Sequence, residues 1–376
     1  MRIAVDARSL TTRPTGVGQY LMAAVNVWAE RNSTHEFLLL AHKPLHAAAR
    51  LALRDCSRIR YLCRPAPLLS GNGLAWLVTE FERSARGFGA DLLWGAGGLL
   101  PPFARMPTLL TVHDLVYRSL PQTLSRRNRL AYGLLAGRSI RRADWIWAVS
   151  QFTAGEVARH YPKRKAIGMV VGSGLNPLRA QHVIGSEQLA LLEQRYRLGS
   201  RSLLFVGTLE PRKNLGFLLS LMPTLARRGF NLIVVGCSGW GRSGMAERVH
   251  GADFPRDAVQ FCDYVSDIDL QGLYRSAALF VSTSLMEGFG LPQLEAMAAG
   301  CPVVAAANSG VVEVVGEGGL LVTGWHAEDW ISAIETAFEL RPALRLKSLA
   351  QATAHDIGTA CDAFDAALSA QWASPA

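Results

Sequence analysis

The chain has 376 residues, 49% of them hydrophobic and 18% charged, which excludes a disordered protein and favours a globular one with a sizeable core. Its length exceeds that of one ordinary domain, so we expect two domains. No stretch approaches the roughly 18–20 apolar residues of a membrane-spanning helix, so no such helix is expected.

The N-terminal stretch MRIAVDARSL indicates a first β-strand rather than a signal sequence, because its apolar run is short. The six cysteines are scattered without a C-x-x-C pair, and four lie in or beside apolar, strand-like runs. We therefore expect buried thiols in a reducing compartment. The expected location is the cytoplasm.

The net charge of +9 is divided unequally along the chain. Residues 1–180 carry 25 Lys and Arg against 10 Asp and Glu, whereas residues 181–376 carry 14 against 20. The basic side chains gather at 126–129, 138–142 and 159–165. A solvated surface, an anionic membrane face and nucleic acid are the alternatives. We find no zinc finger, recognition-helix pattern or RNA-binding aromatic motif, so membrane lipid or a lipid-linked phosphate is favoured over nucleic acid.

Short apolar runs alternate with helical patterns along the whole chain. Strands are expected at 2–7, 35–42, 91–97, 107–114 and 144–150, and then at 202–208, 231–237, 258–264, 278–284, 301–306 and 318–322. Helical stretches include 18–30, 126–142, 215–228, 268–276 and 293–299. This alternation predicts parallel sheets covered on both faces. The Gly-, Pro- and Asn-rich stretch at 172–180 predicts a linker between two α/β domains.

Ligands of open α/β sheets bind beyond the carboxyl ends of the strands, so the loops at those ends are the candidate sites. The first is TTRPTGVGQY, in which Gly16 and Gly18 let the backbone approach a ligand ahead of a helix that we expect to begin near Gly18. A dinucleotide fingerprint is not favoured, because a third glycine is missing. The second is TVHDLVY, which places the titratable pair His113 and Asp114 at the end of a strand.

The third loop follows the strand in LLFVGTLEPRKNLGFLL. Arg212 and Lys213 there precede a helix that begins at Asn214. Two cations beside a helix N-terminus supply complementary parts of a phosphate site. A solvated charge pair is the alternative, but the apolar strand and helix on either side favour a ligand site.

The fourth loop lies in STSLMEGFGLPQLEAMAAGCP, residues 282–302. Glycines around Phe289 expose backbone amides, Pro292 marks a helix start, and Gly300 is the expected C-cap. We expect Glu287 in the turn and Glu295 in the first turn of the helix. Helix-dipole stabilisation could account for Glu295 but not for Glu287, whose carboxylate we expect to accept hydrogen bonds from hydroxyl groups.

The sequence YVSDIDLQGLY has the D-x-D spacing that can hold a metal–nucleotide diphosphate. Ser266 and Asp267 directly precede a helical pattern, however, and helix capping with first-turn charge accounts for Asp267 and Asp269. Metal binding is therefore not favoured here.

With these residues in hand, the chain resembles the family 4 retaining glycosyltransferases of the GT-B architecture. The resemblance runs from residue 1 to about residue 355 and is strongest over 203–322, where V-G-T-x-x-P-R-K-N and E-x7-E with its internal G-F-G-L-P are together highly specific. It implies two Rossmann-like parallel-sheet domains facing each other across a cleft. Residues 1–175 would bind the acceptor, residues 176–355 the nucleotide sugar, and a C-terminal helix within 356–376 would cross back to the first domain.

The resemblance also implies roles for individual residues. Arg212 and Lys213 would grip the donor diphosphate, Glu295 the ribose, and Glu287 the transferred hexose, with His113 near the sugar. The catalytic set is then Glu287, Lys213, Arg212 and His113. The donor-binding set is Gly16, Gly18, Ser150, Val265, Gly288, Phe289, Gly290, Leu291 and Glu295, together with Arg212, Lys213 and Glu287. No metal or other cofactor is expected.

The implied reaction moves a hexose from a nucleotide sugar to a glycan acceptor that is expected to be lipid-linked, at the inner face of a bacterial cytoplasmic membrane. PRKN-type sequences favour GDP-mannose or a GDP-deoxyhexose over UDP-glucose and its relatives as donor. Cell-surface polysaccharide or O-antigen assembly is the expected setting by analogy. A nucleotide-sugar epimerase of the same fold and a non-catalytic sugar-nucleotide-binding module remain as alternatives.

Overall fold

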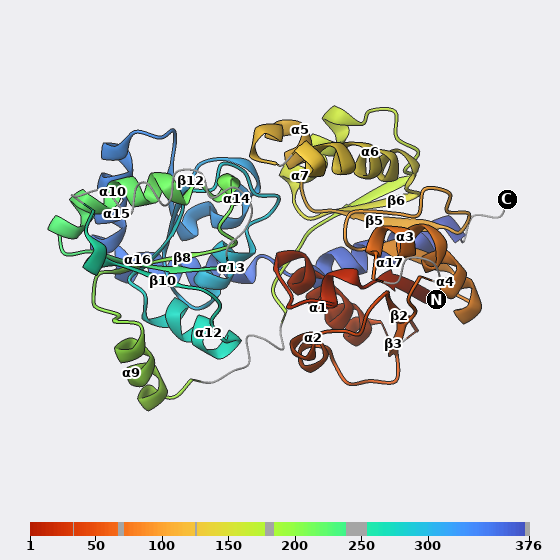
Figure 1. The fold of residues 1–376 in the computed structure, drawn as a ribbon, viewed down its shortest axis with the longest axis horizontal. Coiled ribbons are helices and arrows are strands. Elements are labelled where there is room, and N and C mark those ends of the chain that lie inside the picture. Colours follow the sequence, from red (N-terminus) through yellow and green to blue (C-terminus); the bar gives the residue numbers. More distant parts are fainter. Residues whose placement is uncertain (33, 67–70, 125, 177–183, 238–253, 373–376) are drawn as a thin grey trace. The chain divides into compact units, whose positions relative to one another are not determined.

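The computed structural model describes residues 1–32, 34–66, 71–124, 126–176, 184–237 and 254–372 (Figure 1). The chain folds into two compact units. Unit 1 comprises Met1–Ser119, Arg126–Gln181 and Asp356–Ala376, and unit 2 comprises Leu120–Ser125 and His182–His355. The second half of the expected linker at 172–180 lies outside the described residues.

Unit 1 is built on a parallel sheet of seven strands in the order β3-β2-β1-β4-β5-β6-β7. The strands are β1 Arg2–Asp6, β2 Glu36–Ala41, β3 Ile59–Cys63, β4 Leu92–Gly95, β5 Thr108–Val112, β6 Trp145–Ala148 and β7 Gly168–Val171. Its helices are α1 Gly16–Arg31, α2 Ala47–Ala52, α3 Gly73–Thr79, α4 Phe81–Phe88, α5 Val116–Ser119, α6 Arg126–Arg142, α7 Gln151–His160 and α17 Ile357–Trp372.

Tryptophan rings fill the core of unit 1. Trp94 of β4 and Trp147 of β6 stack with their centroids 5.6 Å apart, and Trp28 of α1 meets both rings edge-on at 5.7 and 5.9 Å. All three side chains are fully buried. Offset and edge-to-face contacts are the favourable arrangements of aromatic rings, so the contacts of Trp28 with Trp94 and Trp147 stabilise the packing of α1 on the sheet.

Unit 2 contains a second parallel sheet, with six strands in the order β10-β9-β8-β11-β12-β13. The strands are β8 Ser202–Val206, β9 Asn231–Val235, β10 Val259–Cys262, β11 Leu279–Ser282, β12 Val303–Ala306 and β13 Gly319–Val322. Its helices are α9 Ser186–Arg195, α10 Leu215–Arg227, α12 Asp267–Ser276, α13 Leu291–Ala298, α14 Ser309–Val315, α15 Ala327–Glu339 and α16 Arg341–Thr353. Two separate hydrophobic clusters, one containing Leu203 and Trp330 and the other Leu204 and Met297, show that apolar layers cover both faces of this sheet.

These sheets confirm the predicted fold class of two Rossmann-like parallel-sheet domains. Strands β3 and β7 are not among the strands predicted from the sequence. Both lie at sheet edges, where one side of the strand is unpaired, and most of their residues are only half-buried. Such strands lack the continuous apolar run on which the prediction depends.

Two helix starts differ from the prediction. Helix α1 begins at Gly16 rather than near Gly18. Helix α13 begins at Leu291, two residues before the predicted start, because Gly290 adopts a left-handed φ of +117° and Pro292 fits the first helical turn. Glu295 consequently lies beyond the first turn of α13, and the predicted first-turn position was wrong.

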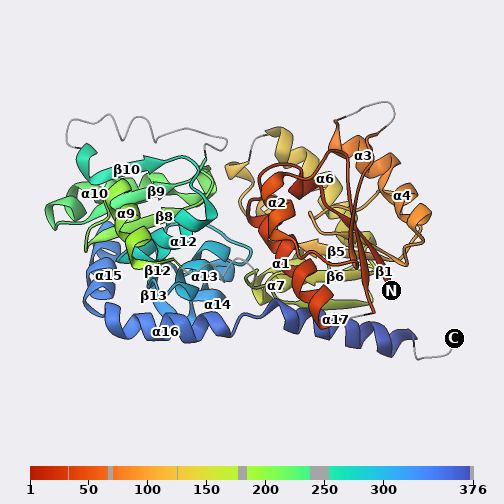
Figure 2. The same ribbon diagram turned by 90° about the horizontal axis from the view of Figure 1, so that it is seen from below.

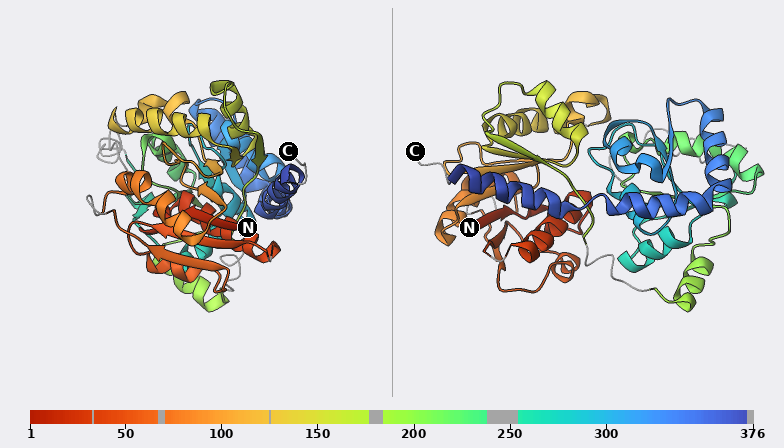
Figure 3. Two further views of the ribbon diagram at one scale, coloured as in Figure 1. Left: turned by 90° about the vertical axis from the view of Figure 1, so that its right-hand side faces the viewer. Right: turned by 180° about the vertical axis from the view of Figure 1, so that it is seen from behind.

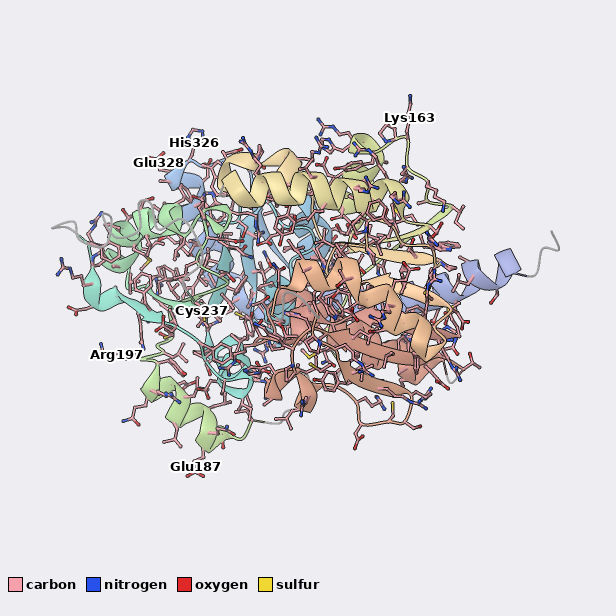
Figure 4. The ribbon with its side chains drawn as sticks, turned by 45° about the vertical axis from the view of Figure 1, so that its right-hand side comes forward. Lys163, Glu187, Arg197, Cys237, His326 and Glu328 are labelled. Atoms are coloured by element: carbon pink, nitrogen blue, oxygen red, sulfur yellow. The ribbon has the colours of Figure 1, made fainter. Side chains whose placement is uncertain are left out.

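The prediction of buried thiols was correct for part of the set only. Cys301 and Cys361 are buried, whereas Cys237 is exposed and labelled in Figure 4, and Cys56, Cys63 and Cys262 are half-buried. Strands β3 and β10, which carry Cys63 and Cys262, are edge strands, and this explains their partial exposure. All six thiols are free.

Helix α17 packs lengthwise along unit 1, beside α1 (Figures 2 and 3). Asp365 of α17 accepts hydrogen bonds from Trp28 Nε1 at 3.0 Å and Asn32 Nδ2 at 2.8 Å, and it lies 2.9 Å from His35 Nε2. Arg31 forms ion pairs with Asp356 and Asp362 at the start of the same helix. The last described helix is therefore an integral part of unit 1.

Candidate active site

Three of the predicted site residues meet at the carboxyl ends of β8 and β11 in unit 2. Glu287 Oε2 accepts from Arg212 Nη1 at 2.6 Å, and Glu287 Oε1 accepts from Lys213 Nζ at 2.5 Å. Ser284 Oγ also donates to Glu287 Oε1, at 2.6 Å. Glu287 and Lys213 are only 7% and 8% exposed, so this is a largely dehydrated cluster of charges.

A short, tightly held loop places the two cations there. The residues Pro211–Lys213 form one 3₁₀ turn, and Asn214 then takes a left-handed conformation with φ +50° before α10 begins. Thr283 Oγ1 donates to the carbonyl oxygens of Lys213 and Asn214 at 3.2 and 3.1 Å. Since β8 and β11 are adjacent strands, the cations and the carboxylate arrive at one edge of the sheet.

The charges of the cluster control the ionisation of Glu287. Burial by itself would raise the pKa of this carboxyl group, but the charges of Arg212 and Lys213 outweigh burial and lower the pKa to about 2. Glu287 is therefore fully ionised at neutral pH. Arg212 also bonds Glu210 Oε1 at 2.5 Å and the carbonyl oxygen of Met286 at 2.7 Å, so its guanidinium is fixed in place from three sides.

The loop that carries Glu287 is fixed by the residues after β12. Ser309 Oγ accepts from the Glu287 backbone N–H at 2.9 Å, and Asn308 Nδ2 donates to the carbonyl oxygen of Ser284 at 3.0 Å. Ser309 has φ +52°, an unusual conformation for a residue with a side chain. Such strain is concentrated at functional sites, and Ser309 shows it where its hydroxyl binds the Glu287 backbone.

The predicted glycine loop follows directly. A Cβ at Gly310 of α14 would lie 2.3 Å from the carbonyl oxygen of Gly288, so α14 approaches this loop as closely as glycine permits. Phe289 is buried and packs edge-on against His355 with centroids 5.5 Å apart. Gln293 Nε2 donates to Ser282 Oγ at 2.8 Å below the loop. The loop of Gly288, Phe289, Gly290 and Leu291 is therefore closely packed against α14 and the residues beneath it.

Glu295 takes part in a different interaction from that of Glu287. Its Oε2 accepts from Tyr274 Oη at 3.0 Å, and Tyr274 belongs to the neighbouring α12. Val265 packs in the hydrophobic cluster at the start of α12. Ser266 caps this helix by accepting from the Asp269 backbone N–H at 3.0 Å, which confirms that capping explains the D-x-D sequence.

Two of the predicted site residues of unit 1, His113 and Ser150, lie at the carboxyl ends of β5 and β6, whereas Gly16 and Gly18 lie at the start of α1. His113 Nε2 donates to the carbonyl oxygen of Ala96 at 2.8 Å, and the His113 ring meets Tyr20 edge-on at 5.0 Å. Burial lowers the pKa of His113 more than the hydrogen bond to Ala96 and the charge of Asp114 raise it. The ring is therefore neutral at neutral pH, with its proton on Nε2.

Ser150 is fully buried and caps α7 by accepting from the Thr153 backbone N–H at 3.0 Å. Ser150 therefore has a structural role as the N-cap of α7. Gly18 also has one, because a Cβ there would lie 2.9 Å from Pro14 Cβ. A Cβ at Gly16 would meet no atom within 4 Å, so the backbone at the start of α1 is open on that side.

Neither a metal-binding cluster nor a membrane-spanning helix is found among the described residues. Among them, no three His, Cys, Asp or Glu side chains are grouped in a way that could hold a metal ion. Nor does any helix in this part of the chain combine the length and apolar character needed to cross a membrane.

Glu287, which the sequence predicts to hold the transferred hexose, has protein partners that the sequence did not reveal. The structure shows both carboxylate oxygens already accepting from Arg212, Lys213 and Ser284. It also adds Glu210 and the pair Asn308 and Ser309, which the sequence analysis did not single out. Their one signal in the sequence is the polar Asn-Ser pair that interrupts VVAAANSGVV at the carboxyl end of a predicted strand.

Comparison with known proteins gives matches over both units. Residues 200–339 match the family model described as glycosyl transferases group 1, and residues 14–177 match that of glycosyltransferase family 4. The O-antigen chain mannosyltransferase B of Escherichia coli is 30% identical over 262 residues, which cover 68% of this chain and 65% of that protein. The serotype-specific mannosyltransferase WbdA of the same species is 30% identical over 182 residues, 46% of this chain and 22% of its own. The chain thus matches less than two thirds of the length of these relatives.

Solved structures share the fold. HepE of Anabaena, determined with UDP and glucose, superposes with a TM-score of 0.73 at 23% identity and covers 98% of this chain and 100% of its own. WaaG, a glycosyltransferase of lipopolysaccharide biosynthesis, superposes with a TM-score of 0.70 at 17% identity, covering 96% of this chain and 98% of its own. At these identities the similarity establishes the fold alone.

Proposed function

Because the chain belongs to the family 4 glycosyltransferases, we propose that it transfers a hexose from a nucleotide sugar to a glycan acceptor with retention of the anomeric configuration. The observation that supports this most directly is the cluster of Arg212, Lys213 and Glu287. The Lys213 ammonium is almost completely buried, and among the described residues its one side-chain hydrogen-bond partner is Glu287. An ammonium has three N–H donors, so it retains donors for a ligand.

The cluster suits the charge that the reaction develops. When the bond between the anomeric carbon and the diphosphate breaks, its electron pair remains on the departing nucleoside diphosphate. Fixed cations in a dehydrated site stabilise that charge without reorganisation. Arg212 pairs with Glu210 and Glu287, and Lys213 pairs with Glu287, so the role of Glu287 in this proposal is to hold both cations in position.

The other predicted residues complete the proposal. The amides of Gly288, Phe289, Gly290 and Leu291 bind the hexose and the diphosphate, Glu295 binds the ribose, and backbone near Val265 meets the base. In unit 1, Gly16 and Gly18 approach the phosphates, with His113 and Ser150 near the sugar. The acceptor hydroxyl attacks on the face from which the diphosphate departs, and a phosphate oxygen takes its proton. Arg212 and Lys213 supply the positive charge, so we expect activity to persist in the presence of a metal chelator.

The relatives guide the choice of donor and setting. The similarity to E. coli mannosyltransferases favours GDP-mannose or a GDP-deoxyhexose, while HepE, which shares the fold, was determined with UDP and glucose. We propose a cytoplasmic protein that acts on lipid-linked glycan in cell-surface polysaccharide or O-antigen assembly. The basic charge of residues 1–180 supports peripheral association with the inner membrane face, and raising the salt concentration should then release the protein from anionic vesicles.

Substitution of Lys213 tests the proposal. Lys213→Ala should lower kcat by about 10²–10³, equivalent to about 3–4 kcal/mol, the usual effect of losing one donor to a developing negative charge. The matched control is Lys347→Ala, which removes an exposed lysine of the same unit. Release of nucleoside diphosphate is followed with each candidate donor, with and without acceptor.

Two results would contradict the proposal. If Lys213→Ala retains full activity, the cluster does not stabilise the leaving group. If the sugar nucleotide is isomerised when acceptor is omitted, the protein is an epimerase. Melting temperatures with GDP, UDP and ADP identify the base, because a ligand that binds only the folded form raises the melting temperature.

A further inference from the structure

A second site lies in unit 1, at the amino end of its sheet. A hollow of about 600 Å³ opens beside Leu92, Thr108 and Trp145, which begin β4, β5 and β6. In a parallel sheet the amino ends of all strands share one edge. The hollow is therefore at the opposite edge from His113 and Ser150, and it is separate from the residues of unit 1 that are assigned to the transferase.

Hydrogen bonds fix the positions of the segments that line the hollow. The Leu100 backbone N–H donates to Ser139 Oγ at 3.0 Å, and Ser139 Oγ donates to the carbonyl oxygen of Leu135 at 2.8 Å. The Leu93 N–H donates to the carbonyl oxygen of Pro107 at 2.9 Å. These bonds join the segment 100–107 to α6 and to the sheet, and they fix the shape of the hollow.

The lining combines an apolar floor with a cationic rim. Leu92, Leu100, Leu135, Trp145 and Leu368 contribute to the floor. The cations that line the hollow are Arg105, Arg138, Arg141, Arg142 and Lys165, and the carboxylates are Asp91 and Asp144. A ligand that matches both parts must be amphiphilic and anionic.

The two carboxylates that line the hollow, Asp91 and Asp144, do not neutralise the charges of its four arginines. Asp144 is engaged by Lys165 Nζ at 2.6 Å and by Thr108 Oγ1 at 2.8 Å, and Asp91 accepts from the Arg2 backbone N–H at 2.7 Å. Within the described residues, no carboxylate lies within ion-pair distance of any of the four arginines. The hollow therefore carries a net positive charge.

The helix dipole gives a structural reason for part of this charge. Arg141 and Arg142 lie in the last turn of α6, where cations are stabilised. The dipole does not account for Arg138, one turn earlier, which donates to the carbonyl oxygen of Pro102 at 3.4 Å, or for Arg105. Three arginines with spacings of three and four residues repel one another when no anion is bound between them.

Exposed apolar side chains flank the same opening. Ile167 lines the hollow and is 59% exposed, and Phe103, in the segment that forms one wall, is 72% exposed beneath the Arg138 guanidinium. A soluble phosphate would satisfy the arginines but would leave these apolar side chains and the floor in water. A lipid at a membrane surface would satisfy both.

We propose that this hollow binds one phospholipid of the membrane, with its phosphate among Arg105, Arg138 and Arg142 and the upper part of an acyl chain on the apolar floor. The inference rests on the membrane association in the proposed function and gives it a defined site. Membrane contact is then made through the amino edge of this sheet, which leaves its carboxyl edge free for the acceptor.

Three variants separate a defined site from diffuse attraction. Arg138→Gln/Arg142→Gln removes two charges from the rim. Leu135→Trp fills the hollow without changing the charge. Arg159→Gln/Lys163→Gln removes two charges from the same unit but outside the hollow, and Lys163 extends into solvent (Figure 4). Circular dichroism and thermal unfolding establish that each variant is folded.

Binding is measured by co-sedimentation with phosphatidylcholine vesicles that contain about one quarter phosphatidylglycerol. The rim and filled variants should bind at least about tenfold more weakly than the Arg159→Gln/Lys163→Gln control. Dihexanoyl phosphatidylglycerol below its micelle concentration should raise the melting temperature of the wild-type protein, and glycerol phosphate at equal concentration should not.

Several outcomes would overturn the proposal. Equal losses in the rim and control variants, with unchanged binding by Leu135→Trp, would show that only diffuse charge matters. An equal effect of glycerol phosphate would show a site for soluble anions. Binding of nucleoside diphosphate by the wild-type protein is measured in parallel: if it persists without lipid binding, only this inference fails, and if lipid binds without it, the proposed transferase fails instead.

Discussion

The substitution Glu287→Gln should destabilise unit 2 in a way that depends on pH. A carboxamide keeps the size of the side chain and one acceptor oxygen, but it removes the negative charge that Arg212 and Lys213 share. The buried ammonium of Lys213 and the partly buried guanidinium of Arg212 would then lose the carboxylate that they share, while Arg212 would keep Glu210. Leaving a buried charge without its partner is among the most destabilising single changes in a protein.

The magnitude follows from the pKa of Glu287. Burial opposes ionisation, but Arg212 and Lys213 lower the pKa from an ordinary value of 4.5 to about 2. With one pKa unit equal to about 1.4 kcal/mol, the charged carboxylate contributes roughly 3 kcal/mol to the free energy of unfolding at pH 7. Glu287 is only 7% exposed, so solvent screening reduces this value little.

The sign of the pH dependence is fixed by the direction of the pKa shift. Because the pKa is lower in the folded state, the stabilisation is fully present above about pH 5 and is lost as the pH falls towards 2. The gap between the wild type and Glu287→Gln should shrink from roughly 3 kcal/mol at pH 7 to about half of that at pH 3.

Hydrogen exchange as a function of urea concentration, followed in peptides from residues 279–298, measures the stability of the unit that contains the cluster. Glu317→Gln is the matched control, since its carboxylate is 89% exposed and pairs with exposed Lys347 at 3.6 Å. This control should change stability by less than about 0.5 kcal/mol. Equal unfolding free energies for the wild type and Glu287→Gln at pH 7, or a gap that widens as the pH falls, would refute the reasoning.

Two further substitutions test the packing of α17 within unit 1 and the space around the glycine loop of unit 2. Asp365→Ala should cost roughly 2–4 kcal/mol, because it removes the hydrogen-bond partner of Trp28, Asn32 and His35. Asp362→Ala removes an exposed ion pair and should cost less than about 1 kcal/mol. Similar melting temperatures for the two variants would contradict this account of α17. Gly310→Ala should displace the glycine loop, since its Cβ would lie 2.3 Å from the carbonyl oxygen of Gly288, and should weaken nucleoside-diphosphate binding in calorimetric titrations. The control is Gly155→Ala on the surface of α7, where a Cβ would meet no atom within 4 Å; this substitution should stabilise the protein by about 0.5–1 kcal/mol. Unchanged ligand binding in Gly310→Ala would show that the loop has room to adjust.

Local sequence was sufficient for the type and order of most elements. Buried parallel strands read as continuous apolar runs, and helices between them read as longer amphipathic stretches, so the two α/β units could be predicted. The resemblance in the segment V-G-T-x-x-P-R-K-N and in E-x7-E likewise picked out Arg212, Lys213 and Glu287, which the structure brings together. Edge strands such as β3 escaped prediction because their residues are only half-buried.

The partners of those residues were decided by tertiary structure. Lys213 and Glu287 are 74 residues apart, and they meet because β8 and β11 are neighbours in a sheet whose order differs from the order of the chain. The same holds for Ser309, which holds the Glu287 backbone, and for Asp365 of α17, which reaches back to Trp28. Hydrophobic periodicity records which side of an element is buried, but it carries no information on which distant element covers that side. The pairing of charges across the sheet, and with it the ionisation of Glu287, therefore follows only from the folded chain.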